Sequence, residues 1–166
     1  MCCAECKLRW VHNQAESWVG TPFHPHARTM SAGVDCVNLA AAIYEGAGVI
    51  EKFDPPPYKM DGGHVLARSQ IYTWLNDSPD FYEIPVNVRQ PGDLICFNLG
   101  GVSHHVGVLL EGNQIIHAMQ RAGVVKCDYG ASLSRRTDRI YRPVAFRNYN
   151  HNTIKDARIA SPCACH

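Results

Sequence analysis

The spacing of apolar residues predicts that the first half of the chain is mainly helical. A first helix is indicated by apolar positions three or four residues apart, which are Leu8, Val11, Ala15, Trp18 and Val19. Gly20 and Pro22 end that pattern. Asp35 is a favourable N-cap for a second helix, which Gly46 and Gly48 terminate. The apolar pattern over 67–75 predicts a third helix, whereas the proline-rich stretch 53–58 predicts an extended loop.

After Pro91-Gly92 the pattern changes from helical to alternating, which is typical of β-strands. We expect strands over 93–97, 104–110, 114–118, 123–127 and 139–146. Helices followed by an antiparallel meander predict an α+β fold. We expect a single domain over 1–147 and an extended C-terminal arm with a cysteine-rich end over 148–166.

Composition excludes several classes of protein. The chain has 166 residues, of which 46% are hydrophobic, and this suits one compact domain. Its formal net charge of +1 argues against a nucleic-acid partner bound by phosphate neutralisation. No apolar run approaches the roughly 18 residues of a membrane span. The start at 1–7 lacks an apolar core, so we expect no secretory signal peptide.

The chain contains 8 cysteines and 9 histidines, and Cys36 is the best-placed candidate nucleophile among them. It lies on the first turn of the second predicted helix, in the stretch Gly33-Val34-Asp35-Cys36. Unpaired N–H groups and the positive end of the helix dipole favour a thiolate there. The alternative is a small buried core residue, because unpaired cysteine is among the most buried residue types.

Two strand histidines could serve this thiol. His105 is a candidate base that takes the thiol proton, and His117 is a candidate for orienting that base. A three-residue loop at 111–113 places His117 opposite Gly107 and diagonal to His105, at a Cβ separation on the order of 7–8 Å. A two-residue loop would place the histidines on opposite faces. We therefore expect the three-residue loop or a compensating bulge, with Gly107 leaving room between the two rings.

Four motifs together resemble the NlpC-type family of papain-like cell-wall cysteine peptidases. They are Asp-Cys at 35–36, Pro-Gly-Asp-Leu at 91–94, His-Val-Gly-Val at 105–108 and Ile-His-Ala at 116–118. Their order and spacing are those of the family. The stretches 18–23 and 33–36 are similar to the small versions from phage and gene-transfer-agent tails.

The resemblance implies that Cys36 is the nucleophile, His105 the base and His117 the orienting residue. The implied reaction is hydrolysis of an amide in the peptidoglycan stem, typically between D-glutamate and the diamino acid. The backbone N–H of Cys36 is the expected first oxyanion donor. No cofactor is expected to be needed for catalysis.

The chain departs from the family pattern near the nucleophile. Many members have Ser-Gly-Leu where this chain has Val-Asn-Leu at 37–39. Many also place a tyrosine hydroxyl where this chain has Phe23, so that His24 or His26 is the candidate replacement. We expect substrate contacts at Phe23, His24 and Asp35.

Cysteines near both ends are not explained by the resemblance. Cys3 and Cys6 have the C-x-x-C spacing of a chelating pair, and Cys163 and Cys165 offer two further thiolates. If the ends meet, these four residues could hold zinc or an iron–sulfur cluster. The alternatives are disulfides or contacts with a partner.

The tail-type resemblance implies a route to the substrate. The enzyme would be made in the host cytoplasm, held at the tip of a virion tail by a hub or tip protein, and act on the bacterial cell wall in the periplasm. The competing hypotheses are an amidase or acyltransferase with a non-wall substrate, and a structural tail-tip subunit with the same fold.

Overall fold

The computed structural model describes residues 3–58, 65–99 and 102–150. In these ranges the α-helices are α1 (Ala4–Trp18), α2 (Cys36–Gly46), α3 (Val65–Asp77) and α4 (Ala131–Ser134). The strands are β1 (Arg28–Thr29), β2 (Gly33–Val34), β3 (Phe81–Ile84), β4 (Leu94–Leu99), β5 (Val102–Leu110), β6 (Gln114–Met119), β7 (Gly123–Asp128) and β8 (Thr137–Pro143). The three expected helices and the expected helix-then-sheet order are confirmed.

The main sheet is antiparallel and has the order β3-β8-β4-β5-β6-β7. Strands β4 to β7 form the expected meander. The last strand does not extend it, because β8 returns to pair with β4 on the other side. This strand ends at Pro143, and the residues expected to continue it, Val144–Phe146, form a 3-10 turn. Strand β3 was not predicted, since its short alternation becomes a strand only by pairing with β8.

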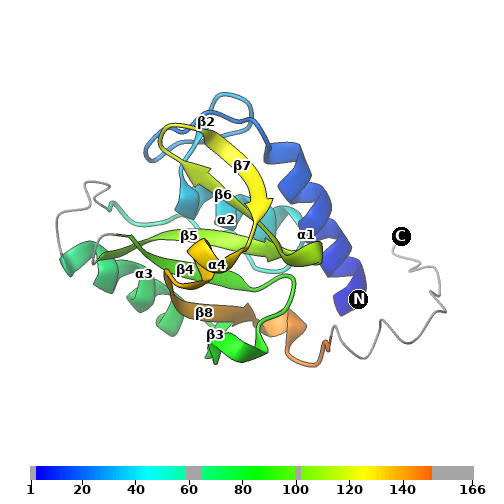
Figure 1. The fold of residues 1–166 in the computed structure, drawn as a ribbon. Helices are drawn as coiled ribbons and strands as arrows, with labels where there is room; N and C mark the ends of the chain where they lie inside the picture. The colour runs from blue at the N-terminus through cyan, green and yellow to red at the C-terminus, as the bar shows by residue number, and fades with distance from the viewer. Residues whose placement is uncertain (1–2, 59–64, 100–101, 151–166) are drawn as a thin grey trace.

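Each face of the sheet has its own apolar core. Helices α1, α2 and α3 pack on one face, where Ile43, Tyr44 and Val108 are almost fully buried. Phe97, Ile115 and other residues form the second core, against which Leu133 of α4 packs. Figure 1 shows α4 in front of the sheet and α2 behind it. Consecutive residues of β5 therefore face different cores.

A buried ion pair joins the start of β4 to β8. Asp93 is fully buried, and its two carboxylate oxygens accept hydrogen bonds from Arg142 at 2.8 and 2.9 Å. The Gln90 N–H also donates to this carboxylate. Burial raises the pKa of Asp93, and the hydrogen bonds from Arg142 and Gln90 partly offset that rise. The Pro-Gly-Asp-Leu motif thus ties β4 to β8 at the start of β4.

Among the residues that the structure describes, no helix combines the length and the apolar character that crossing a membrane requires. The expected arm over 148–166 lies mostly outside those residues.

We predict that Arg142→Met lowers the free energy of unfolding by about 3–5 kcal/mol at pH 7, because it leaves the Asp93 carboxylate buried without its cation. The deficit should shrink at acidic pH, where Asp93 becomes neutral. Urea denaturation at several pH values measures both effects. Lys52→Met is the control, since the Lys52–Asp54 pair is exposed and should contribute under about 1 kcal/mol. Equal losses in both variants would contradict the prediction.

Candidate active site

The start of α2 is held by a buried carboxylate. Asp35 is the N-cap, and its side chain accepts the Asn38 N–H at 2.9 Å. The preceding residues are paired with the loop after α1, since Val34 donates to the Pro22 carbonyl and accepts from the His24 N–H. At Gly33 a Cβ atom would lie 2.6 Å from Cβ of His24, so only glycine fits. Each residue before Cys36 thus helps to place the thiol.

The Cys36 side chain is buried, with 3% of its surface exposed. Burial raises the pKa of the Cys36 thiol to about 12. Backbone N–H groups of Val106, Val37 and Cys36 itself lower this pKa, but by less than burial raises it. The expected thiolate-favouring effect of the helix start is therefore present and outweighed. A nearby base must remove the proton before the sulfur can react.

The predicted loop between β5 and β6 is confirmed. Leu110 pairs with Gln114, and residues 111–113 form a three-residue 3-10 turn. Gly112 and Asn113 have positive φ angles of 69° and 57°. This register, continued along the strands, places His117 opposite Gly107. A Cβ at Gly107 would lie 2.8 Å from Cδ1 of Ile115, so the space at this glycine is occupied by Ile115.

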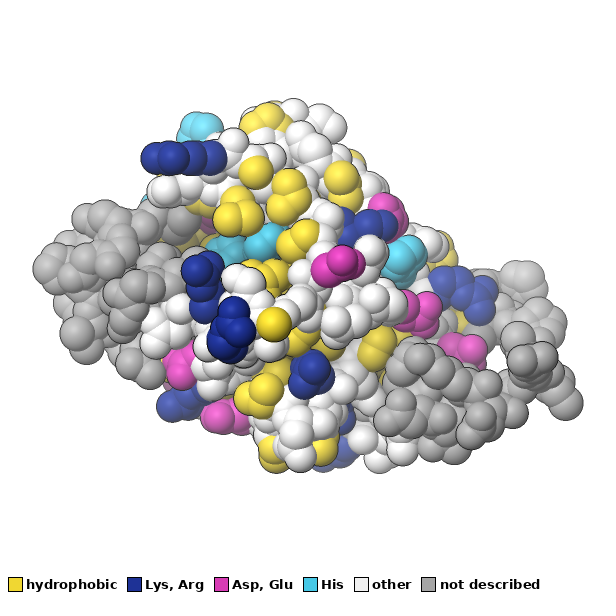
Figure 2. All heavy atoms as spheres, viewed as in Figure 1, with side chains coloured by type: hydrophobic (Ala, Val, Ile, Leu, Met, Phe, Trp, Pro, Cys, Tyr) yellow, Lys and Arg dark blue, Asp and Glu magenta, His cyan; other side chains and the backbone are white. Residues whose placement is uncertain are grey.

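The imidazole rings of His105 and His117 are in contact. Nε2 of His105 lies 2.9 Å from Nδ1 of His117, within hydrogen-bonding distance. Both rings contact Phe97 of the second core, with centroid separations of 5.6 and 6.4 Å. His117 is buried, and burial lowers its pKa, so its imidazole favours the neutral form. Figure 2 shows histidine side chains gathered near the middle of one face of the molecule.

The thiol contacts β5 next to the candidate base. The pairing of β5 with β6 covers Val108–Leu110 and 114–116. Two residues before this paired stretch along β5, the Val106 N–H donates to the sulfur of Cys36. Val106 directly follows His105 in the chain. His105 and His117 are thus in contact with each other, and the Cys36 thiol contacts the residue that follows His105 along β5.

Tyr58 is a residue of this region that the sequence analysis missed. Its hydroxyl donates to the Asp35 carboxylate at 2.5 Å and accepts from Asn38 at 3.1 Å. Burial and the Asp35 charge raise the pKa of Tyr58, which keeps the hydroxyl protonated. The His26 ring packs edge-on against Tyr58 at 4.6 Å. Tyr58 lies far from Cys36 in the chain, in an expected loop, so no local pattern indicated this contact.

The three expected substrate contacts occupy different environments. Asp35 is fully buried, and the His26 N–H also donates to it at 2.6 Å, so its carboxylate is engaged by protein donors. Phe23 is half-buried and forms a β-bridge with Val34. His24 is exposed, with Nδ1 3.1 Å from the Pro25 carbonyl oxygen. Their roles toward a substrate stay predictions.

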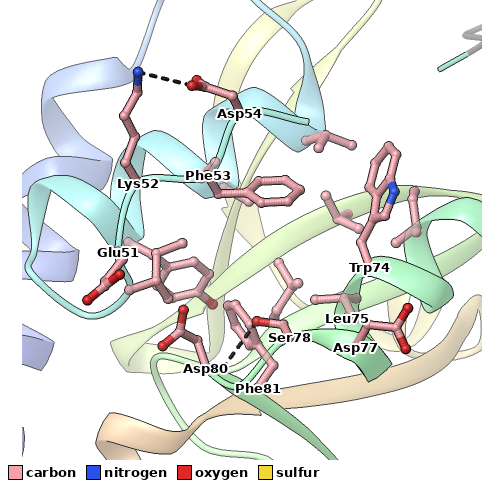
Figure 3. Close-up of a pocket in the computed structure, with 18 of the residues that line it drawn as sticks. Glu51, Lys52, Phe53, Asp54, Trp74, Leu75, Asp77, Ser78, Asp80 and Phe81 are labelled. Atoms are coloured by element: carbon pink, nitrogen blue, oxygen red, sulfur yellow. Dashed lines mark hydrogen bonds and ion pairs between the residues drawn. The ribbon is translucent and has the colours of Figure 1, made fainter. Parts of the chain in front are cut away.

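A cavity of about 480 Å³ lies beside the nucleophile helix, between α2, the loop 50–56, α3 and the start of β3. Val37 and Val106, which flank the thiol, line one side of it. Figure 3 shows the rings of Phe53 and Trp74 at this cavity, with their centroids 6.0 Å apart. Its lining also includes the acidic residues Glu51, Asp54, Asp77 and Asp80 and the basic residue Lys52, whose amine pairs with Asp54 at 3.0 Å.

The predicted metal site is only partly within the described residues. Cys3 is the N-cap of α1, where its sulfur accepts the Cys6 N–H at 3.4 Å. Cys6 is disulfide-bonded, which was one of the alternatives expected for these cysteines. Cys163 and Cys165 lie outside the residues described. Within the described part of the chain, no group of three or more candidate ligands could hold a metal ion.

Comparison with known sequences gives a family match over most of the chain. The family model described as "NlpC/P60 family" matches residues 20–148. Murein DD-endopeptidase MepS/Murein LD-carboxypeptidase of Escherichia coli K12 is 23% identical over 115 residues, which are 69% of this chain and 51% of that protein. The chain therefore spans about half the length of the curated relatives it matches.

Solved structures share the fold at low sequence identity. The peptidoglycan hydrolase RipB of Mycobacterium tuberculosis has a TM-score of 0.57 and 19% identity, covering 84% of this chain and 65% of that one. RipD of the same organism, described as a non-catalytic NlpC/p60 domain protein adapted to peptidoglycan binding, has a TM-score of 0.55 and 17% identity, covering 83% and 97%. The NlpC/p60 domain of the hydrolase SagA has a TM-score of 0.55 and 19% identity, covering 80% and 96%. The expected papain-like α+β fold is confirmed.

We predict that the free energy of unfolding falls as pH falls below about 6.5, partly because of His117. Below that pH His117 binds a proton in the unfolded chain, whereas in the folded chain its lowered pKa keeps the imidazole neutral. His117→Gln removes this contribution, so the difference in stability between wild type and variant should change by up to about 1.4 kcal/mol per pH unit.

Urea denaturation of both proteins between pH 7.5 and 5 measures this difference. His12→Gln, at a histidine whose side chain is 44% exposed on α1, controls for the loss of one imidazole. A difference that is constant across this pH range would contradict the prediction.

Proposed function

The chain belongs to the NlpC/P60 family, and we propose that it is a cysteine peptidase that hydrolyses an amide bond in the peptide stem of peptidoglycan. The observation that carries the proposal is the contact of 2.9 Å between His105 and His117, next to Val106, whose N–H donates to the Cys36 sulfur. This combination supplies a nucleophile, a base and a group that orients the base.

In the proposed mechanism His105 removes the proton from Cys36. Nε2 of His105 faces His117, so Nδ1 is the nitrogen left to accept the thiol proton. Transfer of that proton forms a thiolate and an imidazolium together, and the ion pair compensates for the cost of a buried charge on sulfur. This accounts for activity despite the raised pKa of the Cys36 thiol.

The thiolate then attacks the carbonyl carbon of the scissile amide. The negative charge that develops on the carbonyl oxygen is stabilised by the backbone N–H of Cys36 at the start of α2. His105 returns its proton to the departing amine, and a thioester remains on Cys36. Water, deprotonated by His105, attacks the thioester and releases the product.

We place the scissile bond between D-glutamate and the diamino acid, on the resemblance of the motifs at 35–36, 105–108 and 116–118 to the family. The cavity beside α2 supports a substrate that carries an amine. Its apolar wall is accompanied by the carboxylates of Glu51 and Asp80, which suit a cationic group, whereas Asp54 is already paired with Lys52.

A second candidate function is binding to peptidoglycan without cleavage, as a structural tail-tip subunit. RipD, which shares the fold, is described as non-catalytic and adapted to peptidoglycan binding. The presence of Cys36, His105 and His117 in this chain favours the peptidase. An amidase or acyltransferase acting on a non-wall substrate would use the same three residues.

The proposal extends to delivery. On the resemblance of 18–23 and 33–36 to tail peptidases, we propose that the protein is made in the host cytoplasm and bound at a virion tail tip by a hub or tip protein. It would then reach the cell wall with the particle and act in the periplasm.

We also retain the structural metal site at Cys3, Cys6, Cys163 and Cys165 as a proposal for a reduced form, since a disulfide at Cys6 precludes ligation by its thiolate.

We predict that Cys36→Ala abolishes the release of stem-peptide fragments from purified sacculi, lowering the rate by at least about 10³-fold, because no other group replaces the sulfur. Chromatography and mass spectrometry of the soluble fragments measure the release and identify the bond. Cys96→Val is the thiol control, since Cys96 is a free thiol packed in the first core and valine preserves its apolar contacts. Fragment release by Cys36→Ala at the wild-type rate would contradict the peptidase, whereas binding to sacculi without release by wild type would favour the second candidate.

We predict that the protein co-purifies with assembled tail particles and that Cys36→Ala does so equally, because Cys36 is buried and is not exposed to a tail partner. Immunoblotting of particles separated on a density gradient measures this. Protein found only in the unassembled fractions would contradict the delivery proposal.

A further inference from the structure

Cys127 contacts the far side of the histidine pair. It pairs with Ile115 across β6 and β7, which places it diagonal to His117. Its Sγ lies 3.6 Å from Nε2 of His117, and Nδ1 of the same ring lies 2.9 Å from Nε2 of His105. Contacts therefore run in sequence from β7 through β6 to β5. The sequence analysis predicted the two histidines but left Cys127 without a role.

We propose that Cys127 is a positioning residue, whose sulfur accepts the Nε2–H of His117 and so determines which nitrogen of His105 carries a proton. This inference rests on the proposed function, in which Nδ1 of His105 takes the proton of Cys36. Cys127 touches neither the reacting atoms nor the substrate in this scheme. It acts through His117.

The number of protons on the two rings gives the reason. A neutral imidazole carries one N–H, so His117 either donates or accepts at its Nδ1. When the proton is on Nε2 and donated to sulfur, Nδ1 accepts the Nε2–H of His105. Nδ1 of His105 then has a lone pair for the thiol proton. In the other arrangement His117 donates from Nδ1, His105 is protonated on its own Nδ1, and it cannot act as the base.

The Cys127 sulfur matters most after the proton of Cys36 has been transferred to His105. The His105 imidazolium has N–H groups on both nitrogens, so Nδ1 of His117 must accept and its Nε2–H must donate. His117 is only 3% exposed, which leaves its Nε2–H dependent on a protein acceptor. The acceptor that the structure provides is Sγ of Cys127. A thiol is a weak hydrogen-bond acceptor, but an apolar side chain at position 127 would offer no acceptor at all.

The charged and titratable neighbours are compatible with a neutral thiol in this role. Burial and the adjacent Asp128 raise the pKa of Cys127, so the thiol keeps its proton and its lone pairs near neutral pH. On the same face lie Phe97 and Tyr129, whose hydroxyl is bonded to Thr137. Arg89 lies over the Tyr129 ring at 5.3 Å from its centroid.

The test compares Cys127→Val, which has no acceptor, with Cys127→Ser, which retains one. For Cys127→Val we expect kcat/KM for stem-peptide cleavage to fall about tenfold, because the charged intermediate loses an acceptor. The acid limb of the pH dependence of kcat/KM should move to lower pH by about half to one unit, since the His105 imidazolium is less stabilised. Cys127→Ser should recover most of both effects. Cys96→Val serves as the control for loss of a thiol, since Cys96 packs in the first core and has no role in the proposed site. Urea denaturation verifies that each variant is folded.

A second measurement does not depend on activity. Nitrogen-15 NMR of the histidine rings reports which nitrogen of His117 is protonated. We expect the proton on Nε2 in wild type and in Cys127→Ser, and a mixture of both tautomers in Cys127→Val.

The inference is overturned if wild-type His117 carries its proton on Nδ1, or if Cys127→Val leaves both the tautomer and the pH profile unchanged. A loss of rate in Cys127→Val with an unmoved acid limb and no recovery in Cys127→Ser indicates a packing role and also overturns it. If wild type releases no fragments but His117 is protonated on Nε2 through Cys127, the proposed function fails and the positioning role stands.

Discussion

The hydrogen-bonding contact between His105 and His117 is the interaction on which the candidate site depends, and it follows from the register of one hairpin. Side chains alternate between the faces of a strand, so a slip of one residue would place the two histidines on opposite faces. The turn at 111–113 prevents that slip. Its residues Gly112 and Asn113 adopt positive φ angles, which glycine and asparagine tolerate better than other residues.

The nucleophile is placed by a second constraint, the buried carboxylate of Asp35. It caps α2, accepts the hydroxyl of Tyr58 and accepts the N–H of His26, so three segments converge where the helix begins. Burial of Cys36 then works against ionisation, and a base close to the sulfur is what allows it to react. In the proposed mechanism the helix start positions the thiol, and His105 on β5 removes its proton.

The likeness to both hydrolases and a non-catalytic protein places function in a few side chains of a shared fold. The same sheet and helices are compatible with catalysis or with binding alone, because the two apolar cores on the faces of the sheet do not require a reactive thiol. In this chain a cysteine, two histidines and a second thiol, Cys127, lie on α2, β5, β6 and β7. In the proposed mechanism His105 takes the proton of Cys36, and Cys127 orients the histidine pair through His117.

The sequence by itself determined the helices, the four-strand meander and the loop register, because these depend on local spacing, capping and turn chemistry. The N-cap at Asp35 and the pairing of Leu110 with Gln114 are of this kind. The tertiary structure decided which distant groups complete the site and where the last strand pairs. Tyr58 and Cys127 reach Asp35 and His117 only once α2, the loop before α3 and β7 are packed together. Burial, which dominates the pKa of Cys36, is likewise a property of the whole core and has no signature in local sequence.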